Sequence, residues 1–139
     1  MSLNYLYHLL DSARREQERI HAENAKFRAI ADKIGRIYNE MKQAKSDLID
    51  QKQNMDQFSQ QKYPLWKGNL WANKCEKAMQ DSLVSSGYPT LVRQVDANLD
   101  ALNNAKTDYE NRILRNYGIL GDLAATINSL YTEIANWFN

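Results

Sequence analysis

The feature that most constrains this chain is a series of apolar residues at mostly alternating three- and four-residue steps along residues 3 to 61. Residues at this spacing share one stripe of an α-helix, so the segment is predicted to form one long amphipathic helix over about residues 3–62. At a rise of about 1.5 Å per residue, such a helix would be on the order of 90 Å long. That length exceeds what a small compact globule needs and favours an elongated fold. The series consists of Leu3, Leu6, Leu10, Ala13, Ile20, Phe27, Ile30, Ile34, Ile37, Met41, Ala44, Leu48, Met55 and Phe58.

The apolar stripe is interrupted by polar side chains. Gln17 and Asn24 stand where Leu or Ile is expected, and Gly35 lies inside the predicted helix, where it costs about 1 kcal/mol relative to Ala. Polar residues in such a seam commonly set the register of the helices or the choice of partner.

The stretch KYPLWKGNLW, residues 62 to 71, predicts the end of the first helix and a reversal of the chain. Pro64 lacks a backbone N–H and pushes Tyr63 toward an extended conformation. Gly68 tolerates a positive φ, and Asn69 is a suitable N-cap for the next helix. We therefore expect a turn over residues 63–69 and a second helix over about residues 70–86.

The segment SSGYPT, residues 85 to 90, predicts a further interruption at residues 87–90, which is either a kink or a full turn. The apolar series then resumes and predicts a helix over about residues 91–138. The two arms have similar lengths, so the expected fold is all-α, a single elongated antiparallel helical hairpin over residues 1–139. In this register the last ten or so residues extend past the N-terminus.

Length, charge and cysteine content exclude several classes of protein. A chain of 139 residues has the length of one ordinary domain. Its 18 basic and 17 acidic residues are mixed along the same segments, so no polybasic face is offered to nucleic acid. The single cysteine excludes an intrachain disulfide. The sequence contains no run apolar enough to span a membrane, and its N-terminal residues do not resemble a Sec-type signal.

The sequence offers no constellation for catalysis. His8 and His21 are thirteen residues apart and lack neighbouring ligands at metal-binding spacing. Cys75 falls on an apolar helical stripe, where a thiol usually acts as a small apolar side chain. The glycines are isolated, so no phosphate-binding loop is predicted. We expect neither an enzyme nor a bound cofactor or metal.

The aromatic residues indicate a surface for association. Three tryptophans and eight tyrosines are a large aromatic content for a fold that buries only one stripe of each helix. Aromatic residues on the remaining faces imply contact with a partner or with a second copy. The alternative is that these rings only widen a narrow core.

Trp66, Lys67 and Gly68 form a Trp-x-Gly motif at the expected reversal between two long helices. A small helical chain with this motif in this place resembles the WXG superfamily, the ESAT-6-like helical hairpins of bacterial type VII secretion. The length of the chain is most similar to the longer branch that accompanies LXG-domain toxins. In shorter members a Tyr-x-x-x-Asp/Glu export signal follows the second helix, and neither Tyr117 nor Tyr131 is followed by an acidic residue at that spacing.

The resemblance implies a non-enzymatic adaptor that pairs with the helical N-terminal domain of an LXG-type toxin or with another small hairpin. It also implies a protein that is cytoplasmic before export, with secretion through the type VII system as its expected route and no membrane insertion. The alternative is a structural coiled-coil protein that forms a homodimeric four-helix bundle. The expected partner-binding residues, shared between the hairpin core and a partner groove, are Leu10, Phe27, Ile34, Trp71, Leu130, Trp137 and Phe138.

Overall fold

The protein is known from a computed structural model, which describes residues 2–60 and 76–139. Every element in these ranges is helical: α1 (Leu3–Gln60), α2 (Lys77–Met79), η3 (Gln80–Gly87) and α3 (Tyr88–Trp137). The predicted all-α class is confirmed. The predicted turn, with Trp66, Lys67 and Gly68, and the candidate contact Trp71 lie outside the described residues.

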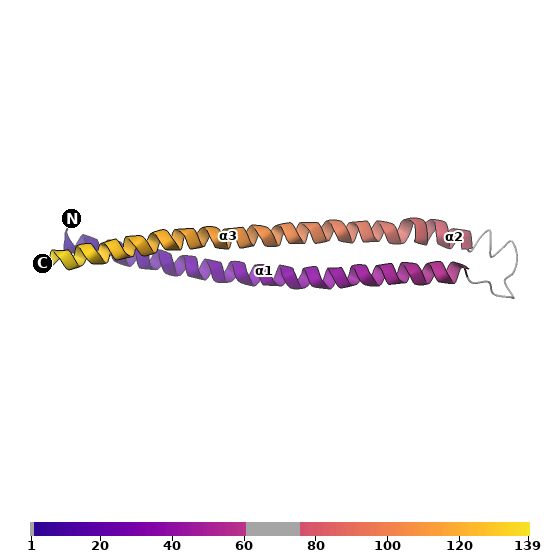
Figure 1. Cartoon of the computed structure of the whole chain (residues 1–139), viewed down its shortest axis with the longest axis horizontal. Coiled ribbons are helices and arrows are strands. Elements are labelled where there is room, and N and C mark those ends of the chain that lie inside the picture. The colour runs from indigo at the N-terminus through magenta and orange to yellow at the C-terminus, as the bar shows by residue number, and fades with distance from the viewer. Residues whose placement is uncertain (1, 61–75) are drawn as a thin grey trace. The chain divides into compact units, whose positions relative to one another are not determined.

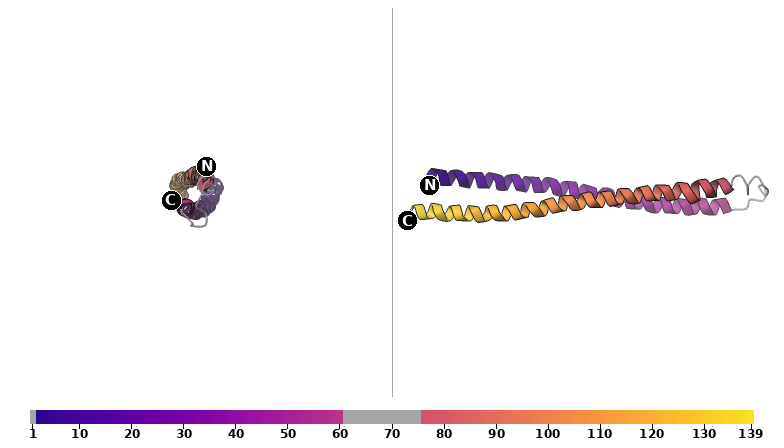
Figure 2. Two further views of the ribbon diagram at one scale, coloured as in Figure 1. Left: turned by 90° about the vertical axis from the view of Figure 1, so that its right-hand side faces the viewer. Right: turned by 90° about the horizontal axis from the view of Figure 1, so that it is seen from above.

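The chain divides into two compact units, each built from one segment of α1 and one of α3. The terminal unit combines Met1–Ile34 with Ala105–Asn139, and the second unit consists of Gly35–Asn104. Within each unit the two long helical segments lie side by side and run in opposite directions (Figures 1 and 2). The expected antiparallel pairing of two long helices is therefore confirmed.

The register of the terminal unit differs from the expected one. Leu130 and Ile134 of α3 are buried in one cluster with Leu6 and Leu10 of α1, and Leu3 packs against it. The expectation that the last ten residues overhang the N-terminus is wrong. Pairing at this register matches apolar residues of both helices near the chain ends, where an overhang would leave them in water.

Buried and half-buried residues in α1 repeat at steps of three and four along nearly its whole length. Two helices with a seven-residue repeat keep one stripe of each facing the other. Supercoiling gives about 3.5 residues per helical turn relative to the partner, so every seventh residue returns to the same place in the seam. The α1 seam consists of Leu3, Leu6, Leu10, Ala13, Gln17, Ile20, Asn24, Phe27, Ala31, Ile34, Tyr38, Met41, Lys45, Leu48, Lys52 and Met55. The α3 seam consists of Tyr88, Val92, Val95, Leu99, Leu102, Lys106, Tyr109, Ile113, Asn116, Leu120, Leu123, Ile127, Leu130 and Ile134.

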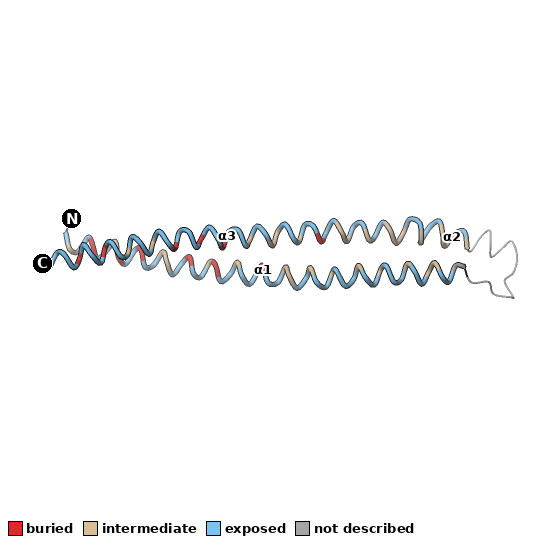
Figure 3. Tube along the Cα trace, viewed as in Figure 1, coloured by how far each residue is buried: buried red, intermediate tan, exposed pale blue. Residues whose placement is uncertain are grey.

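Burial is concentrated in the terminal unit (Figure 3). Among the described residues of the second unit, only Leu99 is buried, whereas the terminal unit buries Leu6, Leu10, Ala13, Ile20, Asn24, Ala31, Ile113, Asn116, Leu120, Leu130 and Ile134. The seam composition explains the difference. In the second unit its positions hold Lys45 and Lys52, whose charged ends must reach water.

The predicted break at residues 87–90 is replaced by a change of helix type. Residues Gln80–Gly87 form a π-helix, and Tyr88 keeps helical dihedrals of φ −63° and ψ −46° while its N–H donates to the Leu83 carbonyl, five residues back. Helix α3 then runs through Pro89. A proline clashes with the carbonyl four residues earlier in an α-helix, and we attribute its tolerance here to the wider π turn before it.

Gly87 fits the π segment because it has no side chain. A Cβ at this position would lie 2.9 Å from the backbone oxygen of Ser82. Any other residue would therefore push the two turns apart.

Candidate interaction surfaces

The described residues hold neither a cluster of metal ligands nor a helix suited to a bilayer. Within residues 2–60 and 76–139, no three His, Cys, Asp or Glu side chains gather where they could hold a metal ion. In the same ranges, none of the helices combines the length and the apolarity that crossing a bilayer requires. The features of the described residues that could bind a partner are the helix surfaces and the polar side chains of the seams.

A buried pair of amides joins the two helices of the terminal unit. The side chain of Asn116 donates from Nδ2 to Oδ1 of Asn24 at 2.8 Å and to Oε1 of Glu23 at 3.1 Å. Asn24 is 2% exposed and Asn116 8%. Among the described residues, Nδ2 of Asn24 has no hydrogen-bond partner. The structure thus places Asn24 in the buried seam, as the sequence predicts, and its role in setting the register stays a prediction.

Beside the amide pair, an exposed network of charges follows one side of α1. Arg19 bonds Glu16 through its Nε at 2.9 Å and forms an ion pair with Glu23 at 3.1 Å. The hydrogen bond from Arg19 holds the pKa of Glu16 below its usual value, and the same bond raises the pKa of Arg19. Because Glu23 also accepts from Asn116, the network links the surface of α1 to the buried pair.

On another side of the terminal unit, arginines of α1 stack on tyrosines of α3. The guanidinium carbon of Arg14 lies 5.3 Å from the ring centre of Tyr131, and that of Arg28 lies 5.4 Å from the ring centre of Tyr117. Such cation–π contacts at exposed sites contribute about 0.5–1 kcal/mol each. They also favour one position for each ring, and both tyrosines remain 45% exposed.

The structure places most of the expected partner-binding residues inside the terminal unit. Leu10 and Leu130 are buried in its core at 4% and 6% exposure. Phe27 and Ile34 are half-buried, and the ring of Phe27 contacts that of Tyr109 at a centroid distance of 5.7 Å. These four side chains contribute to intramolecular packing.

Trp137 and Phe138 have the opposite placement. They are 53% and 68% exposed, and Trp137 borders a shallow hollow with Leu6, Glu133 and Asn136. Of the expected contact residues that the structure describes, these two have the largest exposed apolar surface.

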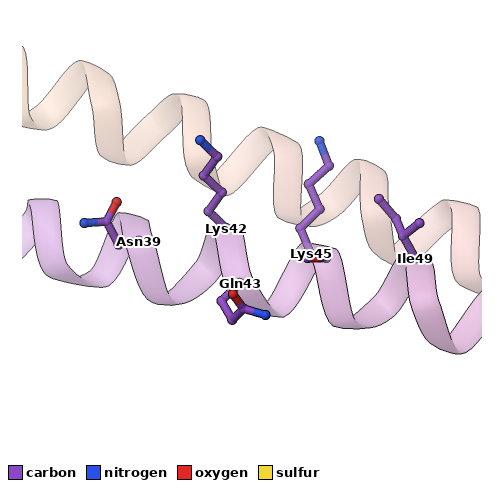
Figure 4. Close-up of a pocket in the computed structure, with 6 residues that line it drawn as sticks. Asn39, Lys42, Gln43, Lys45 and Ile49 are labelled. Atoms are coloured by element: carbon purple, nitrogen blue, oxygen red, sulfur yellow. The ribbon is translucent and has the colours of Figure 1, made fainter.

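The second unit combines a charged seam with exposed apolar side chains. Lys45, at a seam position, forms an ion pair of 2.6 Å with Asp96 of α3. It lines a surface hollow with Lys42 and Ile49 (Figure 4), in which Lys45 and Ile49 point toward α3 and Gln43 points away. The large exposed apolar residues of this unit include Ile37 at 37%, Ile49 at 37%, Leu83 at 39% and Leu91 at 46%.

Sequence reasoning missed several seam residues. In α1 it placed Ala44 in the apolar series, whereas the structure exposes Ala44 and places Lys45 and Lys52 in the seam. In α3 the seam also holds Lys106 and Asn116. An unbroken seven-residue count from Leu3 and Leu10 leads to residues 17, 24, 31, 38, 45 and 52. Strict counting, rather than the search for apolar side chains, was the available signal.

A further stripe on α3 was also missed. It consists of the eight exposed residues Leu114, Tyr117, Gly121, Ala124, Asn128, Tyr131, Ala135 and Phe138, which we call the outer stripe. Each of its residues directly follows a position of the α3 seam or its continuation at Trp137. The signal for it is a second three-and-four spacing within the same helix.

Comparison with known proteins finds no match for this chain among family models, curated proteins or solved structures.

Proposed function

We propose that this chain is a non-enzymatic adaptor of bacterial type VII secretion, a WXG-like protein that pairs with the helical N-terminal domain of an LXG-type toxin. The support comes from the antiparallel pairing of two long helices and from the Trp66-Lys67-Gly68 motif in the segment that connects them. In this proposal the adaptor acts by binding alone.

The observation that carries the proposal is the thin core of the second unit. Leu99 is its only buried residue among those described, while Ile37, Ile49, Leu83 and Leu91 keep more than a third of their surface exposed. Complete burial of such a side chain stabilises by about 1.5–3 kcal/mol relative to exposure, so a partner helix that covers several of them gains substantially. The exposed residues lie on both long segments of the unit, which suits a partner that adds helices alongside them.

The polar seam residues of this unit favour a specific partner over general adhesion. Lys45 is two-thirds buried at its side chain and is paired with Asp96, whose side chain is 46% exposed. The accessible carboxylate and the ammonium group of Lys42 beside the hollow give a partner helix charges to match. Charge matching at the edge of an apolar contact selects among helical partners of similar hydrophobicity.

Co-expression with the N-terminal domain of an LXG toxin encoded beside this chain tests the proposal. The two proteins are expected to purify together as a complex of defined mass. Ile49→Glu is expected to weaken the complex by at least about tenfold, because it places a charge in the apolar contact. Gln43→Glu, which adds the same charge on the side that points away from α3, is expected to bind as the unmodified chain does (Figure 4).

Failure of the two proteins to associate would end the proposal. Equal binding by the Ile49 and Gln43 variants would remove the second unit as the contact surface. Recovery of the toxin in the medium, with and without this chain and with the secretion ATPase inactivated, then tests the role in export.

A further inference from the structure

The outer stripe gives the terminal unit a second apolar face besides its core. Leu114 is 64% exposed, Tyr117 and Tyr131 are 45% exposed, and Phe138 is 68% exposed. Each residue of the stripe is offset by one position from the seam, which turns it about 100° around the helix. The face therefore lies beside the intramolecular core, with Arg14 and Arg28 of α1 at its two tyrosines, and its residues are exposed.

The outer stripe carries no charged side chain along residues 114 to 138. Charges in this part of α3 stand at other positions, such as Arg115, Asp122 and Glu133. A partner that relied on complementary charges would find nothing to pair with on the stripe itself. A second copy of the same stripe brings no charge on its own residues, and the guanidinium groups of Arg14 and Arg28 stack on the rings of Tyr131 and Tyr117.

The order of large and small residues makes the stripe complementary to itself. When two copies of α3 lie antiparallel, the pairing that places Leu114 opposite Phe138 also places Tyr117 opposite Ala135 and Tyr131 opposite Gly121. Ala124 then faces Asn128 at the centre. Each tyrosine ring thus meets a small residue of the other helix, as interdigitating packing requires.

The same pairing satisfies the geometry of an antiparallel seam. The stripe has two sets of seven-residue positions, one with Leu114, Gly121, Asn128 and Ala135 and the other with Tyr117, Ala124, Tyr131 and Phe138. In antiparallel helix pairs a residue of one set faces a residue of the other set. All four pairings obey this rule, and a twofold axis through the centre forms each of them twice.

Contacts within the single chain restrict the tyrosines of the stripe before any association. Arg14 and Arg28 stack on the rings of Tyr131 and Tyr117 from α1. A side chain that is already fixed loses less conformational entropy when a second surface covers it.

We infer that the outer stripe, from Leu114 to Phe138, is a homodimer interface in which α3 of one copy packs antiparallel on α3 of another, with Tyr131 over Gly121 of the second copy. At about 1.5 Å per residue the contact extends over roughly 37 Å. This inference does not depend on the proposed function, because the toxin contact is assigned to the second unit.

Two glycines of α3 allow a matched test. A Cβ added at Gly121 or at Gly118 meets nothing within 4 Å in the single chain, and both positions are exposed, so a side chain at either is expected to leave the fold intact. Only Gly121 lies on the stripe. Sedimentation velocity of the full chain is expected to show a dimer, and Gly121→Tyr is expected to raise its dissociation constant by at least about tenfold. Gly118→Tyr is expected to change it less than about threefold.

A size exchange tests the register. In the double variant Gly121→Tyr with Tyr131→Ala, the tyrosine at 121 of one copy faces the alanine at 131 of the other, so a ring again meets a small residue. The double variant is expected to recover most of the affinity that Gly121→Tyr loses. Leu114→Glu provides a second disrupting change at a residue whose exposure makes it safe for the fold.

A chain that stays monomeric at about 100 μM, near the weak end of specific protein association, would overturn the inference. Equal effects of the Gly121 and Gly118 variants would also overturn it, and failure of the size exchange would overturn the register. If dimers form while the toxin domain does not bind, the interface stands and the proposed function fails. If the toxin domain binds while no dimers form, the proposed function stands and the dimer interface fails.

Discussion

At the scale of single residues, the buried contact between Asn24 and Asn116 lowers stability but favours one alignment of the two helices. Asn24 accepts from Asn116 but leaves its own Nδ2 unpaired at 2% exposure. An unpaired buried amide costs about 1–3 kcal/mol, whereas two apolar residues of similar shape at the same place cost nothing of this kind. The pair therefore favours one alignment of α1 and α3, because any shift would leave both amides unpaired in apolar surroundings.

Replacement of one or both asparagines tests this reading. Asn116→Leu is expected to lower the free energy of unfolding by about 1–3 kcal/mol, since Asn24 then loses its only partner. The double change of Asn24 and Asn116 to Leu is expected to be neutral or stabilising. Urea denaturation measures both, with Asn111→Leu at an exposed position of α3 as the control. A double variant as unstable as Asn116→Leu would contradict the explanation.

At the scale of elements, the π-helical segment η3 reconciles Gly87 and Pro89 with a continuous helix. The wide turn brings the Ser82 carbonyl beneath Gly87, and the N–H of Tyr88 bonds the Leu83 carbonyl. Regular α-helix through the same residues would set the proline ring against the carbonyl of Ser85. Gly87 and Pro89 thus change the type of helix at this point without ending it.

Two Gly→Ala substitutions compare the steric demand of the π-helical segment with that of the α-helix. Gly87→Ala is expected to destabilise the protein by about 1–2 kcal/mol, because its Cβ meets the Ser82 oxygen at 2.9 Å. Gly118→Ala is expected to stabilise by up to about 1 kcal/mol, because its Cβ meets nothing within 4 Å and alanine favours the helix. Thermal denaturation followed by circular dichroism compares the two. Equal shifts of the two midpoints would refute the steric account of Gly87.

At the scale of the whole molecule, stability is distributed unevenly between the two units. The terminal unit holds the buried cluster of Leu6, Leu10, Leu130 and Ile134, while the second unit buries only Leu99 among its described residues. Local opening requires less free energy where few apolar contacts must be broken. The second unit is therefore the part of the chain whose stability a partner can change most.

Hydrogen exchange tests this distribution. Amides of residues 35–58 and 76–104 are expected to exchange faster than those of residues 6–34 and 105–134, because their helices have less buried apolar surface. Addition of the toxin domain is expected to slow exchange in the second unit. Homodimer formation is instead expected to slow exchange around residues 114–138. Uniform protection along both helices would show that the thin seam does not weaken the second unit.

Sequence alone determined the helical class, the long antiparallel pairing and the polar seam position of Asn24, because apolar spacing and helix-breaking residues act locally. It did not determine the partner of Asn24, the level chain ends or the continuity of the helix through Gly87 and Pro89. Those depend on how two helices align, which is decided by the sum of many weak contacts along both seams. The tertiary structure also decided which aromatic residues face outward, since only the packed register assigns Leu130 to the core and leaves Tyr131 on the outer stripe.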